Sequence, residues 1–330
     1  MKILVRLPNW LGDMVMAEGV MNALPKVFPG AAISVIVKKG LQDLVPFMGE
    51  IASVYVFDKE KNKGIKGAWT FGKEIKNKEI FDLFICLPNS LSSALMAKAT
   101  GAKMRLGYNN EGRSLLLTHS FNKEKGIHRV EEYIGLLEQF LGKEIREKEV
   151  LLHHHFLKKE YLILNINSEA SSRRLTPNKA IEIINHLRIN SKEMIILIGA
   201  PKEKSFVESV YYGLATKEGI ENRAGSTTLL ELIELLASAK LVLSTDSGPA
   251  HLANALGTFT VALFGAGNEK NTGPYNQDKR TIIRLGQLGC EPCEKNVCLR
   301  FDTPQCLERL SPMVIGEVIC KELSKTNKNG

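Results

Sequence analysis

The sequence has no long apolar run. None of its stretches approaches the roughly 18 consecutive apolar residues that a membrane-spanning helix needs. Near the start, one short apolar run is interrupted by Arg6, which does not fit the apolar region of a secretory signal peptide. We therefore expect neither a membrane span nor secretion. With only 12 prolines, 44% hydrophobic and 24% charged residues, the composition also excludes disordered and collagen-like classes.

Negative charge is in the minority. Lysine and arginine number 44 against 36 aspartate and glutamate residues, which gives a net charge of +8 and a pI near 9.0. This mild excess favours an acidic partner, such as a phosphorylated lipid, a nucleotide or a nucleic acid. The length of 330 residues suits about two domains, each large enough to bury its own core.

Apolar periodicity predicts two series of alternating strands and helices. In the first half, strands are expected at 2–6, 32–37, 53–57, 82–87 and 104–107, and helices at 14–28, 41–48, 67–76, 90–100 and 129–141. In the second half, strands are expected at 161–166, 193–198, 240–245 and 258–264, and helices at 177–187, 202–212, 229–238, 249–256 and 311–323. A polar stretch at 142–159 separates the two series as a linker.

Such alternation is typical of parallel, doubly wound α/β sheets. We expect two Rossmann-like domains, residues 1–155 and residues 156–330, that face each other across a ligand cleft. The last predicted helix, at 311–323, docks on one of the two halves.

Familiar nucleotide signatures are missing. The first strand-to-helix turn contains only Gly12, so the three-glycine dinucleotide fingerprint is absent. Gly67, Gly72 and Lys73 imitate a P-loop, but Glu74 occupies the position of the magnesium-binding hydroxyl. Phosphate binding must therefore be sought elsewhere.

A better candidate follows the apolar strand at 240–245. Asp246 and Ser247 can cap a helix there, Pro249 suits its first turn and Gly257 suits its end. Backbone N–H groups and the helix dipole at such a start would hold a diphosphate. Gly248 would allow close approach of the anion, and His251 would add a donor. The alternative is an ordinary capped helix with a structural histidine.

Several sequence blocks, in order along the chain, carry a family resemblance. They are Trp10-Leu-Gly-Asp-Met14, Glu111 to His119, His128 to Tyr133, Ser244 to Gly257, Val261 to Gly265 and Gly273-Pro-Tyr275. Together they resemble the ADP-heptose:lipopolysaccharide heptosyltransferases of glycosyltransferase family nine, and are most similar to the heptosyltransferase II branch.

The resemblance implies the two-domain glycosyltransferase B fold, with the acceptor on the N-terminal domain and the ADP-sugar on the C-terminal one. It implies an inverting transfer of L-glycero-D-manno-heptose from ADP-heptose to lipopolysaccharide, as the second heptose on heptosyl-Kdo2-lipid A. The enzyme would work without a required cofactor, as a peripheral protein at the cytoplasmic face of the inner membrane.

The resemblance also implies roles for individual residues. Asp13 would be the catalytic base, although an aspartate at a helix start is often a cap. The residues that would bind the ADP-sugar donor are Ser171, Ser172, Arg174, Glu203, Asp246, Ser247, Gly248, Pro249 and His251. Trp10 and Arg113 would contact the acceptor, with core packing as the alternative for Trp10. After Gly265 the family usually has a threonine and a proline, whereas this chain continues Ala266-Gly-Asn-Glu269.

Four of the six cysteines form a C-x₂-C-x₄-C-x₇-C arrangement, namely Cys290, Cys293, Cys298 and Cys306. Four thiolates suit zinc or an iron–sulfur cluster, but the second pair lacks the tight knuckle spacing. The sequence therefore predicts no required metal and leaves this cluster as a lesser alternative.

Two other functions remain open at this point. A family-nine enzyme could use another nucleotide sugar. A basic nucleic-acid-binding module organised by the cysteines would explain the charge and the cysteines, but none of the other sequence blocks.

Overall fold

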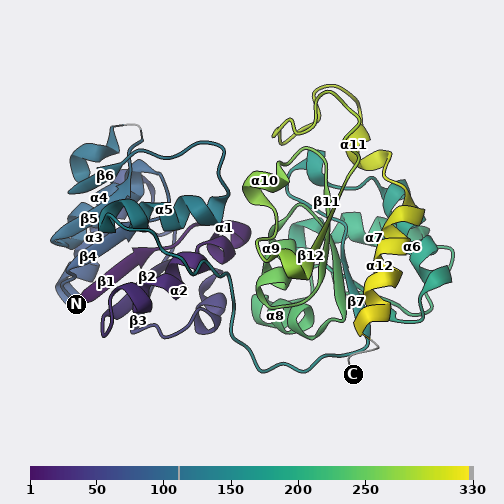
Figure 1. The fold of residues 1–330 in the computed structure, drawn as a ribbon, viewed down its shortest axis with the longest axis horizontal. Helices are drawn as coiled ribbons and strands as arrows, with labels where there is room; N and C mark the ends of the chain where they lie inside the picture. Colours follow the sequence, from purple (N-terminus) through teal and green to yellow (C-terminus); the bar gives the residue numbers. More distant parts are fainter. Residues whose placement is uncertain (111, 327–330) are drawn as a thin grey trace. The chain divides into compact units, whose positions relative to one another are not determined.

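Two parallel sheets organise the chain, each in its own compact unit. The computed structural model describes residues 1–110 and 112–326. The first unit comprises Met1–His153, and the second begins at His154. Each sheet contains six strands and lies between layers of helices (Figure 1). This arrangement confirms the expected pair of doubly wound α/β folds.

In the first unit the strand order is β3-β2-β1-β4-β5-β6. The strands are β1 (Lys2–Arg6), β2 (Ala32–Lys38), β3 (Ser53–Phe57), β4 (Leu83–Cys86), β5 (Met104–Tyr108) and β6 (His119–Phe121). The helices are α1 (Leu11–Met16), α2 (Glu18–Val27), α3 (Gly64–Lys78), α4 (Leu91–Thr100) and α5 (Arg129–Leu141), with short 3₁₀ turns η1 (Gln42–Phe47) and η2 (Arg113–Leu116).

Alternating side chains of the central strands pack against the two layers of helices, one on each face of the sheet. Leu4 and Phe84 face the core formed with α3 and α4, where Phe71 also packs. On the other layer, α2 packs against α5, and Gly19 lies close to the side chain of Ile134. Strands buried on both faces read as continuous apolar runs, which is why the sequence revealed them clearly.

In the second unit the strand order is β12-β11-β10-β7-β8-β9. The strands are β7 (Tyr161–Asn165), β8 (Met194–Leu197), β9 (Ile220–Asn222), β10 (Leu241–Thr245), β11 (Thr260–Phe264) and β12 (Arg280–Arg284). The helices are α6 (Pro177–Asn190), α7 (Lys204–Gly213), α8 (Leu229–Ser238), α9 (Gly248–Ala255), α10 (Glu269–Thr272), α11 (Gln305–Glu308) and α12 (Pro312–Thr326), with 3₁₀ turns η3 (Ser171–Arg173), η4 (Pro201–Glu203) and η5 (Gln277–Lys279).

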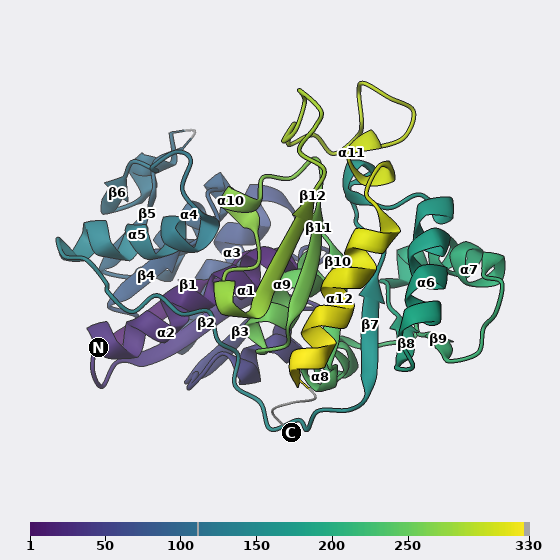
Figure 2. The ribbon, with the colours of Figure 1, turned by 45° about the vertical axis from the view of Figure 1, so that its right-hand side comes forward.

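The terminal helix α12 packs along α6 (Figure 2). Gly316 on α12 lies so close to the ring of His186 that a Cβ atom there would approach the ring to 2.5 Å. The expected docking of the last helix therefore falls on the second unit. Among the described helices, none is both long and apolar enough to cross a bilayer.

Some predicted elements differ from the structure. The helix expected at 14–28 is broken at Ala17 into α1 and α2, and the segment 41–48 forms the 3₁₀ turn η1 around Pro46. Strands β6 and β9 were missed because three residues are too few to show a period. Strand β12 was missed because arginines flank its short apolar centre.

Candidate active site

Each sheet has one position where the strand order reverses. In the first unit this switch point lies between β1 and β4, and in the second it lies between β7 and β10. Ligands of doubly wound folds bind beyond the carboxyl ends of the strands at such points. The predicted site residue Asp246 follows β10 directly, and Asp13 lies in α1, the first helix after β1, so topology places each of them at a switch point.

The loop that follows β1 is held by a buried arginine. The guanidinium of Arg6 donates hydrogen bonds to the carbonyl oxygens of Leu7 and Ile36 and to Oδ1 of Asn9. Burial lowers the pKa of Arg6 to about 10, yet the group stays protonated at neutral pH. These bonds fix the backbone that leads into α1, and with it the position of Asp13.

Asp13 lies in the first turn of α1, whose N-cap position is occupied by Trp10. Its side chain is 30% exposed, so it is accessible without being fully solvated. Burial raises the pKa of the carboxyl, while Arg129 acts in the opposite direction. A carboxylate of raised basicity at a switch point is suited to accept a proton.

A charged network surrounds Asp13. Arg129 Nε lies 3.7 Å from Asp13 Oδ1, and Arg129 Nη1 lies 3.0 Å from Glu132 Oε2. Lys123 Nζ lies 2.7 Å from the same Glu132 oxygen. The Glu132 side chain is almost completely buried, and it forms ion pairs with both Arg129 and Lys123. Sequence reasoning missed this network, because Arg129 lies 116 positions from Asp13 and shares no motif with it.

Trp10 is 59% exposed, which rules out the core-packing alternative. The ammonium group of Lys38 lies 5.5 Å from the centroid of its ring. An exposed indole beside a cation offers a platform for an anionic sugar. The sequence prediction of Trp10 as an acceptor contact is thus compatible with its surroundings.

The structure does not place Arg113 where an acceptor could contact it. Its side chain is completely buried, and Nη1 donates a 2.6 Å hydrogen bond to the carbonyl oxygen of Pro88. A Cβ atom on Gly107 would lie only 2.5 Å from its Nη2 atom. The guanidinium therefore supports the loop after β4 from within and is not accessible to an acceptor. Glu111, at the start of the same sequence block, lies outside the described residues.

In the second unit, polar side chains fill the switch point. Asn165 at the end of β7 donates hydrogen bonds to Ser244 Oγ at 3.0 Å and to Ser247 Oγ at 2.7 Å. Nearby, Asn167 donates to the carbonyl oxygen of Ile198 at 2.8 Å, and Thr245 Oγ1 donates to the carbonyl oxygen of Asn167. The two asparagines, which the sequence analysis did not select, tie the loops after β7, β8 and β10 together.

The predicted side-chain cap of α9 is not formed. Ser247 is the N-cap residue, but within the described chain its hydroxyl makes no cap bond, because it accepts from Asn165 and donates to the Thr245 carbonyl. Pro249 does lie in the first turn, and Gly257 follows the helix with a φ of 74°. The buried His251 lies one turn after Gly248. A helix start without a side-chain cap keeps its capacity to bind an anion.

Asp246 forms an ion pair with Arg173. The guanidinium Nη1 of Arg173 lies 3.3 Å from Asp246 Oδ2. Burial raises the pKa of Asp246 to about 6, although Arg173 opposes the rise. The backbone of Gly267 lies directly against this carboxylate, since a Cβ atom on Gly267 would approach Oδ2 to 1.9 Å. Arg173 was not predicted as a site residue; its neighbour Arg174 was.

The loop 265–269, where the chain departs from the family pattern, is held by Arg284. This β12 side chain donates to the carbonyl oxygens of Gly265 and Gly267 and pairs with the carboxylate of Glu269. Asn268 caps the short helix α10 by accepting a 3.1 Å hydrogen bond from Lys270 N. Residues of this chain thus fix the loop without the usual threonine and proline.

Ser171 and Ser172, predicted to contact the donor, form hydrogen bonds with the cysteine-rich segment. Ser171 Oγ donates to the carbonyl oxygen of Asn296 at 3.3 Å, and Ser172 Oγ donates to that of Lys295. Arg174 Nε donates to the Ser168 carbonyl oxygen at 3.2 Å, and its guanidinium lies 5.2 Å from the ring of Phe206. These three side chains order the loop after β7 and its contact with the cysteine-rich segment.

Glu203 also has a local partner. Its Oε2 atom accepts a 2.8 Å hydrogen bond from the backbone N–H of Ala200, so it caps the turn η4. Among the described residues its other oxygen has no hydrogen-bond donor within the protein, so that oxygen can accept from a ribose hydroxyl, as the predicted contact requires.

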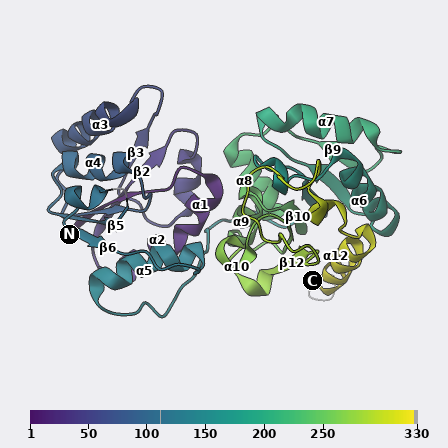
Figure 3. The ribbon, with the colours of Figure 1, turned by 90° about the horizontal axis from the view of Figure 1, so that it is seen from above.

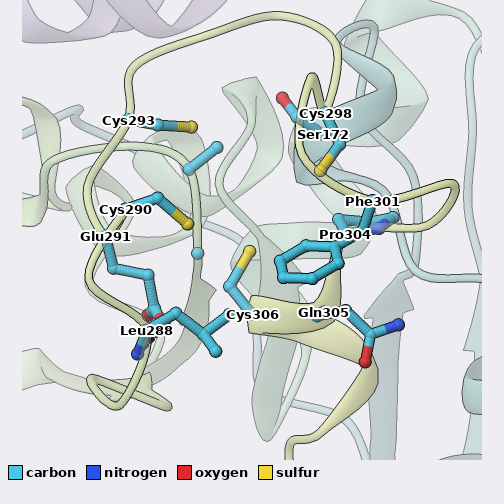
Figure 4. Close-up of a pocket in the computed structure, with 12 residues that line it drawn as sticks. Ser172, Leu288, Cys290, Glu291, Cys293, Cys298, Phe301, Pro304, Gln305 and Cys306 are labelled. Atoms are coloured by element: carbon cyan, nitrogen blue, oxygen red, sulfur yellow. Dashed lines mark hydrogen bonds between the residues drawn. The ribbon is translucent and has the colours of Figure 1, made fainter.

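The four clustered cysteines line one pocket together with Phe301 and Gln305 (Figure 4). Their sulfur atoms point toward the same space, and all four are free thiols. Burial raises the pKa of Cys306 to about 11. Four sulfurs are a suitable donor set for zinc or iron, yet no three Cys, His, Asp or Glu side chains of the described residues are arranged to hold an ion. We therefore derive no step through a metal.

Comparison with known proteins identifies the family of the chain. The model of "Glycosyltransferase family 9 (heptosyltransferase)" matches residues 68–301. Lipooligosaccharide heptosyltransferase 2 of Campylobacter jejuni is 25% identical over 97% of this chain and 99% of its own length. Lipopolysaccharide heptosyltransferase 2 of Escherichia coli is 27% identical over 86% of this chain and 88% of its own.

Among solved structures, E. coli ADP-heptose lipopolysaccharide heptosyltransferase II matches with a TM-score of 0.84 and 24% identity. The match covers 99% of this chain and 100% of that one, so both units share its α/β fold of glycosyltransferase B type. Because the family model spans more than half of the residues, the chain belongs to glycosyltransferase family 9 and is a glycosyltransferase.

Proposed function

We propose that the chain transfers L-glycero-D-manno-heptose from ADP-heptose, with inversion, to the inner core of lipopolysaccharide. The acceptor would be heptosyl-Kdo2-lipid A, which receives its second heptose. The observation that carries this proposal is Asp13, a partly exposed carboxylate of raised pKa, placed at the switch point of the first unit. The similarity to heptosyltransferases 2 supports the choice of donor and acceptor.

The reaction requires one general base, which accepts a proton. The acceptor hydroxyl loses its proton to Asp13 as its oxygen attacks the anomeric carbon of the heptose, and the bond from that carbon to the diphosphate breaks. ADP leaves as a stable anion, so a general acid is not required. Attack on the face opposite the diphosphate inverts the anomeric configuration.

Fixed donors in the second unit stabilise the charge that develops on the diphosphate. We assign this role to the start of α9, at Ser247, Gly248 and Pro249, with His251 one turn further. The helix dipole favours an anion there. Arg173, on the loop after β7, supplies a cation beside this helix start, since it contacts Asp246. Arg174, Ser171 and Ser172 order that loop, and Glu203 is assigned to the ribose.

The first unit supplies the groups suited to an anionic acceptor. Trp10, Lys38 and Arg129 surround Asp13 or the loop that leads to it, and Arg129 is only partly buried. An acidic core sugar would be attracted by the two cations and would stack on the indole. In this proposal Arg113 acts by supporting the loop after β4, and the enzyme works at the cytoplasmic face of the inner membrane without a required cofactor.

The test is a transfer assay with ADP-heptose on heptose-deficient lipid A cores of defined length. The expected product is larger by one heptose, and only with the core that already carries one heptose. Calorimetric titrations with ADP-heptose, ADP-glucose and UDP-sugars identify the donor. Tighter binding of another nucleotide sugar, with transfer from it, would replace ADP-heptose in this account.

A further inference from the structure

One segment of the first unit carries a large share of the positive charge. Between residues 59 and 78, which include α3, there are seven lysines and two glutamates. All seven lysines are exposed. From Lys61 onward, none of them has an acidic partner at ion-pair distance in the part of the chain that the structure describes. The catalytic proposal uses none of these lysines.

Two large apolar side chains are exposed among these lysines. Ile65 is 56% exposed and Trp69 is 37% exposed. With Lys73 they follow each other at intervals of four residues, so they lie along one side of α3. The ammonium group of Lys73 lies 5.6 Å from the centroid of the Trp69 ring.

A neighbouring side of α3 is firmly packed. Phe71 and Ile75 belong to the buried core, and Phe71 contacts Phe57 with ring centroids 5.1 Å apart. Gly72 brings α3 so close to α4 that a Cβ atom on it would lie 2.6 Å from the carbonyl oxygen of Met96. In Figure 3, α3 lies beside α4 at the edge of the first unit. The helix is therefore held in one orientation, and its exposed side is a fixed surface.

We propose that this surface, made of Lys61, Lys63, Ile65, Lys66, Trp69 and Lys73, docks on the anionic headgroups of a phospholipid bilayer. It rests on the proposed function in one respect, because an acceptor anchored in a membrane gives the docking its purpose. Lysines near an anionic membrane surface are attracted electrostatically, each by an amount comparable to thermal energy or somewhat more. Tryptophan is enriched at the boundary between headgroups and acyl chains, where its ring is half buried and its N–H stays hydrated.

The pairing of charge with apolar groups favours a bilayer over other acidic partners. Lysines alone would fit a nucleic acid equally well. Ile65 contributes nothing to phosphate recognition, but it gains from burial among acyl chains. A second copy of the chain would bring lysines against lysines, which repel each other.

The experiment is vesicle flotation of the full chain. Vesicles of phosphatidylcholine mixed with phosphatidylglycerol are compared with vesicles of phosphatidylcholine alone, at low and high salt. Wild-type protein is expected to float with the anionic vesicles only, and to be released by salt. The double variant Lys66→Glu/Lys73→Glu is expected to lower the partition coefficient by about tenfold or more.

The control is Lys143→Glu/Lys192→Glu, which changes the net charge equally at two exposed lysines elsewhere. It is expected to retain most of the binding. Equal losses in both double variants, or no flotation of the wild type, would overturn the proposal. A concentration-dependent self-association that only the Lys66→Glu/Lys73→Glu variant loses would also overturn it, in favour of a second copy as the partner.

A second measurement reports on Trp69 directly. The chain has two tryptophans, so Trp10→Phe leaves Trp69 as its sole indole. Its emission is expected to shift to shorter wavelength with anionic vesicles, and an unchanged emission would contradict the docking geometry. Transfer to a delipidated, water-soluble core acceptor separates this inference from the proposed function. The Lys66→Glu/Lys73→Glu variant is expected to keep this transfer activity. If the wild-type protein itself lacks the activity, that result would count against the proposed function alone.

Discussion

Nε of Arg129 lies 3.7 Å from Oδ1 of Asp13, while another nitrogen of the same guanidinium binds the buried Glu132. The two contacts hold the cation beside Asp13 without covering the carboxylate. Burial raises the pKa of Asp13 and Arg129 lowers it. The net result is a carboxylate whose pKa lies above that of a solvated aspartate, which makes it a stronger base.

Removal of this cation should shift the pH dependence of transfer. Asp13 works as a base only when ionised, so the rate falls as the pH drops through its pKa. In Arg129→Met the lowering influence is gone, and the acidic limb of kcat/KM against pH should move to higher pH. The measurement is that profile with a saturating donor.

Arg129→Lys is the matched control, because it keeps a positive charge near Asp13. Its acidic limb should stay closer to that of the wild type. An unchanged limb in Arg129→Met would show that Asp13 does not govern the titration. A loss of acceptor affinity alone, with the limb in place, would make Arg129 a binding group only.

Gly267 should be sensitive to the smallest substitution. In Gly267→Ala the new methyl group would approach Asp246 Oδ2 to 1.9 Å, so the loop 265–269 must shift. We expect a loss of about 1–3 kcal/mol in the free energy of unfolding of the second unit, measured by urea denaturation. ADP affinity should fall as well, because the loop lies against Asp246 beside the α9 start.

Gly289→Ala tests the same change where there is room. No heavy atom among the described residues lies within 4 Å of a Cβ built at Gly289. The expected change in unfolding free energy is under about 0.5 kcal/mol. Equal effects at both glycines would mean that backbone flexibility, and not the contact with Asp246, determines the outcome.

Asp246 should give stability an unusual pH dependence. Its pKa in the folded protein is about 6, against an ordinary value of 3.8, so the folded state binds this proton more tightly than the unfolded chain does. The contribution to stability is therefore fully present below pH 4, and it is lost as the pH rises to about 6. The loss amounts to about 3 kcal/mol at most.

Asp246→Asn removes that titration. Between pH 4 and 6 the free energy of unfolding of the wild type should decline relative to this variant, as measured by urea denaturation at each pH. The same substitution at the exposed Asp278 should give a curve parallel to the wild type. Parallel curves for Asp246→Asn as well would contradict the burial-driven rise in its pKa.

Helices and strands could be predicted from the sequence where the apolar period and the signals for both ends of the element were present. Strand β3 and helices α5 and α8 have the bounds that periodicity predicted, because apolar period and end signals coincide there. The break at Ala17 could not be predicted, because the apolar positions continue through it. The residues that hold the site together were harder still, since their partners lie far along the chain.

Arg173 and Arg174 illustrate this limit. The family resemblance selected Arg174, whereas in the structure Arg173 pairs with Asp246 and Arg174 lies over the ring of Phe206. Arg173 is the last residue of η3 and Arg174 follows it in extended conformation, and no local sequence pattern tells which of the two side chains faces the site. In the same way, the cysteine spacing left a four-thiolate site as a lesser alternative, and only the structure shows that the four thiols line one pocket.

The central claim is that Asp13 is the base, and the variant Asp13→Asn tests it most directly. This change keeps the shape of the side chain and removes its basicity. Transfer from ADP-heptose and ADP binding by calorimetry are measured on the same preparation. The account predicts a loss of transfer by at least about a hundredfold with unchanged ADP affinity, whereas near-normal turnover in Asp13→Asn would contradict it.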